Sequence, residues 1–180
     1  MNNEMPVTLV TYTNSVMNDA WDIYFGQLDK HVNLKSIVFS DIECTKYKNH
    51  KFVKYDNNDP YYKQYLDCLK NVEDDFIIYM QEDFFAYDDI DVEKIKSCMS
   101  FLKNTDYSFV RLIRAGYKTP LDNHIQDDLY EVDANTSDAF TMQVTLWKKD
   151  RLVELYDKVK SEKWYEGENW NSKCQELEIK

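Results

Sequence analysis

The strongest candidates for chemistry are two adjacent carboxylates that follow an apolar run. Phe76–Met80 is continuously apolar, and Gln81, Glu82 and Asp83 come directly after it. Carboxylates at the end of a buried strand are costly to desolvate, and one reason to place them there is to bind a hard divalent cation. A metal at this point would hold a diphosphate and stabilise it as a leaving group. Because side chains alternate along a strand, we expect Asp83 to be the metal ligand and Glu82 to support it or end the sheet.

The same acidic pair also has a purely structural interpretation, in which it ends the strand and caps a turn, since exposed charge is the default at a protein surface. The overall charge bears on this choice. Lys and Arg number 22 and Asp and Glu number 33, which gives a net charge of 22 − 33 = −11. Such a chain is not expected to bind nucleic acid or an anionic membrane. It binds phosphate only through a divalent cation or a local cationic pocket.

The length and composition predict a globular chain with its own core. With 180 residues, 43% of them hydrophobic, the chain corresponds to about one domain, 1–180, which stands alone or belongs to a longer protein. We find no signal peptide and no run of about 18 apolar residues that would span a membrane. The four cysteines are scattered without a CxxC pair, so we expect reduced thiols in a cytoplasmic, intracellular protein.

Elements that position the carboxylates alternate between strand and helix. Short apolar runs rich in β-branched residues predict strands, and apolar residues at helical spacing after a capping residue predict helices. The sequence therefore predicts an α/β fold with a mostly parallel sheet and helices on both faces. Expected strands cover 7–12, 36–40, 76–80, 107–113 and 141–147. One expected helix carries Trp21 to Val32, and a second begins at Asp59-Pro60. Two more are expected to be capped by Asp91 and by Asp150. Residues 43–58 and 115–128 are expected as loops, the first with one extended piece, and 162–180 as a polar tail.

In such a sheet, ligands bind beyond the carboxyl ends of the strands. This rule places the chemistry at Tyr12–Asn14, Ser40-Asp41, Glu82-Asp83 and Arg114. Neither GxGxxG nor GxxxxGK[ST] occurs, which argues against a dinucleotide-binding or P-loop version of the architecture.

The order of these features resembles the nucleotide-sugar glycosyltransferases of the GT-A fold, and more narrowly bacterial and viral members with a QEDFF signature. Tyr79–Phe85 stands in the place of the family's DxD motif, with Gln81 where a first carboxylate often lies, so the resemblance leaves metal dependence open. The other matching pieces are Val7–Asn14, Ser40-Asp41, Val110–Leu112, Gln143–Lys148 and Glu162–Glu166, the last resembling a closing Trp-x-Glu element.

The resemblance implies a role for each matched residue. Asp83 would hold Mg²⁺ or Mn²⁺ on the diphosphate. Glu166 would be the general base that takes the proton of the acceptor hydroxyl in an inverting transfer. Residues implied in substrate binding are Thr11, Tyr12 and Thr13 near the base and ribose, Asp41 near the base, Arg111 or Arg114 near the phosphates, and Trp164 against a sugar ring.

Structural roles remain open for the same residues. Tyr12 would also serve as packing, Asp41 as a loop cap, Arg111 as the partner of a buried acid, and Glu166 as an acid at a helix start. Further aromatic residues that would stack on a sugar, or simply pack, are Tyr61, Tyr62, Phe84, Phe85 and Trp170.

The function that the resemblance implies is transfer of a sugar from a nucleoside diphosphate to a glycan or similar acceptor, assisted by a divalent metal. One alternative is a metal-dependent nucleotidyl- or phosphoryl-transferase, although such enzymes usually carry more converging carboxylates or a glycine-rich loop. Another is a catalytically inactive domain of the same fold that binds carbohydrate or a protein partner.

Overall fold

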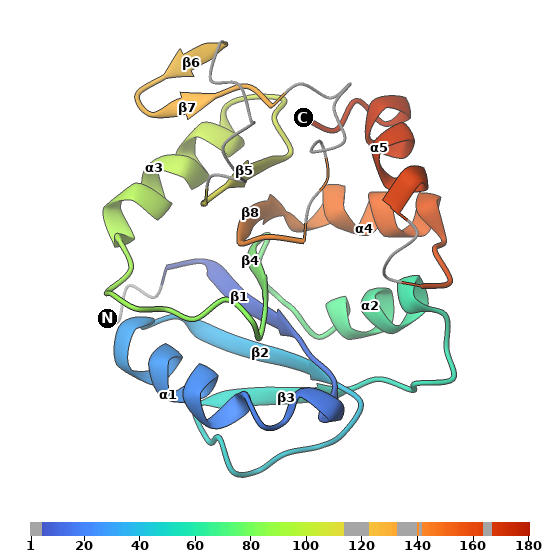
Figure 1. The fold of residues 1–180 in the computed structure, drawn as a ribbon. Helices are drawn as coiled ribbons and strands as arrows, with labels where there is room; N and C mark the ends of the chain where they lie inside the picture. The colour runs from blue at the N-terminus through green and yellow to red at the C-terminus, as the bar shows by residue number, and fades with distance from the viewer. Residues whose placement is uncertain (1–4, 114–122, 133–139, 141, 164–166) are drawn as a thin grey trace.

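The computed structural model describes residues 5–113, 123–132, 140, 142–163 and 167–180 (Figure 1). Strands in this part of the chain are β1 (Val7–Tyr12), β2 (Lys35–Ser40), β3 (His50–Lys54), β4 (Phe76–Gln81), β5 (Phe109–Arg111) and β8 (Thr145–Lys148), with a separate hairpin of β6 (His124–Gln126) and β7 (Leu129–Tyr130). The six-stranded sheet has the order β3-β2-β1-β4-β8-β5. Strands β1 to β4 are parallel, and β8 is antiparallel to both of its neighbours. The sheet is therefore mixed and mostly parallel, as the sequence predicts.

Helices cover both faces of this sheet (Figure 1). On one face α1 (Trp21–His31) and α3 (Val92–Lys103) share a core with Leu9 and Ile78. On the other face α2 (Tyr61–Leu69), α4 (Lys149–Val159) and α5 (Gly167–Glu176) share a core with Val10 and Tyr79. Neighbouring residues of β1 and β4 thus serve opposite cores, which is why both strands are buried along nearly their whole length.

Strand β3, the hairpin β6–β7 and helix α5 lie wholly or partly in stretches that the sequence predicts as loop or polar tail. Strand β3 is the extended piece in the stretch 43–58, and the hairpin β6–β7 begins within the expected loop 115–128. Helix α5 lies in the polar tail, where Trp170 and Cys174 are buried on its inner side. Trp170 stacks on Phe140 with ring centroids 4.5 Å apart, so it is a core residue rather than a sugar contact. Two apolar residues spaced four apart are too few to reveal an amphipathic helix in sequence.

Helix starts follow the predicted caps only in part. Asp91 caps α3 as predicted, because its carboxylate accepts the N–H of the fourth residue in that helical turn. Asn14 instead caps the short 3₁₀ helix η1 (Ser15–Met17), and α1 begins after Ala20 without a side-chain cap. Pro60 is the N-cap of α2 rather than its first residue, and α4 begins one residue before Asp150. A side-chain cap therefore marks the start of α3, whereas α1, α2 and α4 begin without one.

No helix in the described part of the chain is long and apolar enough to cross a membrane. All four cysteines fall within the described ranges and are free thiols, and Cys68, Cys98 and Cys174 are buried.

Candidate functional site

The carboxyl ends of β1, β2, β3 and β4 meet at one edge of the sheet. Tyr12 is level with Phe39 of β2 and with Gln81 of β4, and Ser40 is level with Lys54 of β3. The loops that follow these four strands therefore begin side by side. Predicted site residues that the structure places at this edge are Thr11, Tyr12, Thr13, Asp41 and Asp83.

Asp41 is the centre of a hydrogen-bonded group directly after β2. Its carboxylate accepts the backbone N–H of Ser15 (2.7 Å), the hydroxyl of Ser15 (2.6 Å) and the amide of Asn57 (3.0 Å). Partial burial raises the pKa of Asp41, but these hydrogen bonds outweigh burial and hold the pKa below its ordinary value. The side chain is therefore a carboxylate at neutral pH, and it ties the loop after β1 to the loop after β3.

A hollow of about 480 Å³ lies beside this group, and Tyr55 forms part of its wall. The Tyr55 hydroxyl donates to the carbonyl of Thr13 (2.9 Å), and the Asn14 amide lies 3.3 Å from the Tyr55 hydroxyl and 3.2 Å from the Asn57 side-chain carbonyl. The hollow is lined by Asp41, Lys54, Tyr55, Asp56 and Asn57. Sequence reasoning missed Tyr55 and Asn57, although the polar run that follows β3 gives the same signal as the ends of β1 and β2.

Tyr12 is mainly a packing residue. Its ring is stacked on Tyr55 (centroids 5.1 Å apart, planes 3° apart) and, on another side, near Tyr65 (5.5 Å, 22°). Its hydroxyl donates to the side-chain carbonyl of Gln64 at 2.6 Å. Burial raises the pKa of the Tyr12 hydroxyl, with the Tyr55 hydroxyl adding to the shift. Tyr12 therefore supports the hollow through Tyr55.

Thr11 and Thr13 use their hydroxyls inside the protein. The Thr11 hydroxyl hydrogen-bonds to the Tyr24 hydroxyl (2.8 Å), and the Thr13 hydroxyl accepts the indole N–H of Trp21 (2.9 Å). Both threonines are fully buried. These bonds fix the end of β1 against α1, so the two side chains set the position of the loop that carries Ser15.

Glu82 and Asp83 lie in a turn rather than on the strand. The N–H of Phe84 donates to the carbonyl of Gln81 (3.2 Å), so the strand's alternation of side chains ends there. Glu82 is 8% exposed, whereas Asp83 is exposed. Burial raises the pKa of Glu82; its own backbone N–H counteracts part of the shift, and the charge of Asp83 adds to it. Glu82 thus takes the place at the sheet end, and Asp83 is the carboxylate that reaches solvent.

Asp83 offers a single carboxylate, which fits one kind of metal site. Mg²⁺ is often bound through one or two carboxylates together with the phosphates of a substrate. Among the described residues, the group of side chains placed closely enough to hold an ion by themselves is His31, Asp88 and Asp89, and Asp83 is not part of it. The donor set at the end of β4 therefore fits a metal that arrives with a diphosphate.

Arg111 does not join the group around Asp41. It is the last residue of β5, and β4 and β8 lie between β5 and β1. At the usual spacing of strands, that separation is about 14 Å. Arg111 instead lines a second hollow beside α3. The predicted residues Arg114, Trp164 and Glu166 lie outside the described residues.

Comparison with known proteins shows the fold. No protein-family model and no curated protein matches the sequence. Among solved structures, TarS 1-349 of S. aureus superposes with a TM-score of 0.60 at 16% identity, over 94% of this chain and 55% of that one. The glycosyltransferase GlyE of Streptococcus pneumoniae TIGR4 gives 0.53 at 12% identity, over 94% and 42%. A 4-diphosphocytidyl-2C-methyl-D-erythritol synthase from Anaerococcus prevotii gives 0.54 at 12% identity, over 96% and 82%.

These similarities confirm the GT-A-like α/β fold that the sequence predicts. The chain spans about half the length of the TarS fragment that it matches. TarS 1-349 has also been solved in complex with UDP-GlcNAc, in a structure that superposes on this chain with a TM-score of 0.52.

Proposed function

We propose that this chain binds a nucleoside diphosphate sugar at the carboxyl edge of β1 to β4 and transfers the sugar to a hydroxyl of a glycan or similar acceptor. The observation that carries the proposal is the hydrogen-bonded group around Asp41 beside an open hollow. In open α/β sheets this edge is the usual ligand site. The fold is shared with a protein solved with UDP-GlcNAc and with a glycosyltransferase, which supports a nucleotide-sugar ligand here.

The group around Asp41 has the chemistry to hold a base and ribose. A carboxylate accepts hydrogen bonds from ring N–H or hydroxyl groups, and the Asn57 amide offers both a donor and an acceptor. Hydrogen bonds from Ser15 keep Asp41 in place. Asn14, which also donates to the Tyr55 hydroxyl, keeps Asn57 in place. The side chains of Asp41 and Asn57 therefore lose little conformational entropy when a ligand binds. Thr11, Tyr12 and Thr13 contribute indirectly, because their contacts hold the end of β1 in place.

Asp83 would hold Mn²⁺ or Mg²⁺ on the diphosphate, where the metal would neutralise charge on the leaving group. Arg114 follows β5 in sequence and is proposed as a cationic residue for the phosphates. Glu166 is the proposed base: it takes the acceptor hydroxyl's proton as the new C–O bond forms and the bond between sugar and diphosphate breaks. Trp164 is proposed to stack on a sugar ring.

Calorimetric titration with UDP, with and without Mn²⁺, tests the donor site. We expect Mn²⁺-dependent binding that Asp83→Asn weakens at least about tenfold, because the variant loses the charge of the metal ligand and keeps its shape. Asp106→Asn is the matched control, since Asp106 is equally exposed but precedes β5 at the opposite edge. Unchanged UDP affinity in Asp83→Asn would remove the metal assignment.

The same titration separates the alternatives. A nucleotidyltransferase is the second candidate because the Anaerococcus synthase shares the fold over most of its length, and it would bind CTP in preference to UDP. Against it, the loop after β1 reads Thr13-Asn14-Ser15 without a glycine to wrap a triphosphate. An inactive carbohydrate-binding domain would bind sugar but no nucleotide.

A further inference from the structure

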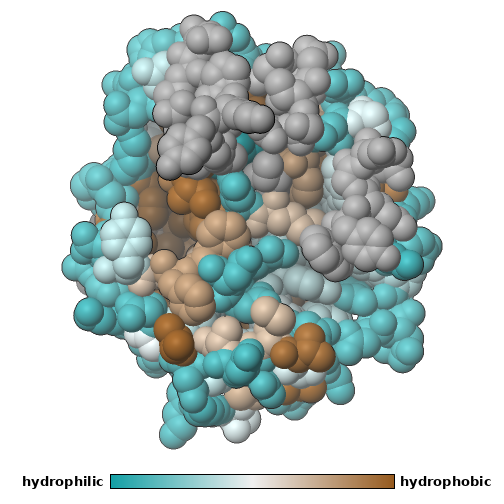
Figure 2. Space-filling view, viewed as in Figure 1, coloured by the Kyte–Doolittle hydropathy of each residue, from teal (hydrophilic) through white to brown (hydrophobic). Residues whose placement is uncertain are grey.

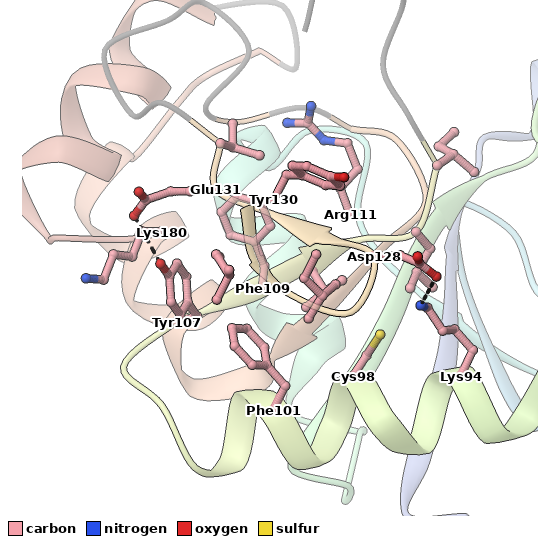
Figure 3. A pocket seen from close by; sticks show the side chains of 16 residues that line it. Lys94, Cys98, Phe101, Tyr107, Phe109, Arg111, Asp128, Tyr130, Glu131 and Lys180 are labelled. Atoms are coloured by element: carbon pink, nitrogen blue, oxygen red, sulfur yellow. Dashed lines mark hydrogen bonds and ion pairs between the residues drawn. The ribbon is translucent and has the colours of Figure 1, made fainter. Parts of the chain in front are cut away.

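A second hollow, of about 400 Å³, lies between α3, β5 and the hairpin β6–β7 (Figure 3). Its wall is mostly apolar, and the volume is within the range of small-molecule sites. Figure 2 shows apolar side chains gathered in a hollowed part of the surface beside the region that Figure 1 labels α3 and β5. The lining includes Cys98 and the apolar side chains of Phe101, Phe109, Val110 and Leu129.

The charged groups of this wall are already engaged within the protein. Lys94 forms an ion pair with Asp128 (2.8 Å). The Tyr107 hydroxyl donates to Glu131 (3.1 Å), and the Lys180 ammonium lies 5.1 Å from the centre of the Tyr107 ring. Arg111, too, has a partner inside the protein. Each of these charged groups thus has an interaction within the protein, and the apolar side chains of the wall offer no strong hydrogen-bonding group to recognise sugar hydroxyls.

The hollow extends along β5 toward the proposed donor site. Its lining includes every residue from Phe109 to Ile113, together with Tyr107, which lies two residues before the strand. Because β4 and β5 are both antiparallel to β8, they run in the same direction. Ile113 therefore lies toward the edge of the sheet at which Asp83 leaves β4.

From this placement we propose that the hollow beside α3 holds a hydrocarbon chain, and that the chain belongs to the acceptor. This inference rests on the proposed transfer of a sugar at the carboxyl edge. A chain seated against Phe101, Val110 and Leu129 would leave its polar end near Ile113, on the side of the donor site. The acceptor class is thus a hydroxyl compound with an acyl, alkyl or prenyl tail, bound by burial of apolar surface.

Titration with 1-decanol, followed through the methyl NMR signals of the protein, tests occupancy directly. We expect saturable shifts of the Val110, Ile125 and Leu129 methyls, while Val10 in the core on the opposite face of the sheet stays unchanged. Glucose, a polar probe, should leave these signals in place. Cys98 projects into the hollow from α3, so Cys98→Phe should fill it and abolish the shifts (Figure 3). Ser97→Phe is the control, because it adds the same ring on the exposed side of that helix.

Thermal unfolding of Cys98→Phe shows whether the variant is folded. Absence of saturable decanol shifts in the wild-type protein would overturn the proposal, as would side chains of the protein itself filling the hollow in a crystal structure.

Transfer assays then test the link to the acceptor. We expect n-decyl glucoside to have a KM at least about tenfold below that of methyl glucoside, since burial of the alkyl chain favours binding. Equal KM values would overturn the assignment of the chain to the acceptor. Transfer to neither glucoside would count against the proposed function, while the decanol shifts would still decide whether the hollow holds a chain.

Discussion

The ends of β2 and β4 each carry an acid at the same edge of the sheet, under opposite conditions. Asp41 after β2 receives hydrogen bonds from Ser15, Ser40 and Asn57, and its pKa is lowered. Glu82 after β4 is buried with less compensation, and its pKa is raised. A charged group is stabilised where donors converge and destabilised where burial alone acts. The end of β2 is therefore built to present a carboxylate, whereas the end of β4 keeps its exposed charge on Asp83.

Removal of the Asp41 carboxylate should have the largest effect. Asp41→Ala should lower the free energy of unfolding by about 3 kcal/mol, because Ser15 and Asn57 lose a charged acceptor. UDP affinity should fall by at least about tenfold if the hollow binds the base. Urea unfolding and calorimetry measure the two effects. A variant with normal UDP affinity would show that the carboxylate only caps the loop.

Tyr12 lies on β1, between the ends of β2 and β4. Removal of its hydroxyl tests whether Tyr12 only packs or also contacts the ligand. Tyr12→Phe should lower the free energy of unfolding by about 1.5 kcal/mol, because Gln64 loses its donor. The stacked ring remains, so UDP affinity should be unchanged. Calorimetry that showed a clear loss of UDP affinity would place the Tyr12 hydroxyl in contact with the nucleotide.

The pH dependence of the free energy of unfolding should differ between Glu82 and Asp41, and this effect should be smaller than those of Asp41→Ala and Tyr12→Phe. A raised pKa means that Glu82 stabilises the fold when protonated, fully below about pH 4.5, and that this contribution is lost as pH rises through the raised pKa. Glu82→Gln should thus match the wild type at low pH and exceed its free energy of unfolding at pH 7 by about 1 kcal/mol.

Asp41→Asn supplies the reverse case for this pH series. The lowered pKa of Asp41 makes its stabilisation present above about pH 3.8 and lost as pH falls through the lowered value. Urea unfolding from pH 3 to 8 measures both variants. Parallel curves for Glu82→Gln and the wild type would contradict the contrast drawn between the ends of β2 and β4.

Much of the framework was predictable from local pattern. The apolar runs at 7–12, 36–40 and 76–80 form the parallel centre of the sheet, because strands buried on both faces leave a nearly continuous apolar signal. The rule that ligands bind beyond the carboxyl ends then placed Asp41 and Asp83 at one edge. Helix α5 and the hairpin β6–β7 gave no comparable signal, since their burial depends on distant partners such as Phe140.

By itself, the sequence determined the order of β1, β2 and β4 with the helices α1 to α4, and the edge at which its acids emerge, since both follow from short-range periodicity. Only the tertiary structure decided which acid is buried, because a turn after Gln81 ends the strand's alternation. It likewise decided that Tyr55 and Asn57 join Asp41 and that Arg111 lies away from them. Such neighbours are set by the order of strands in the sheet, which depends on contacts between residues far apart in the chain.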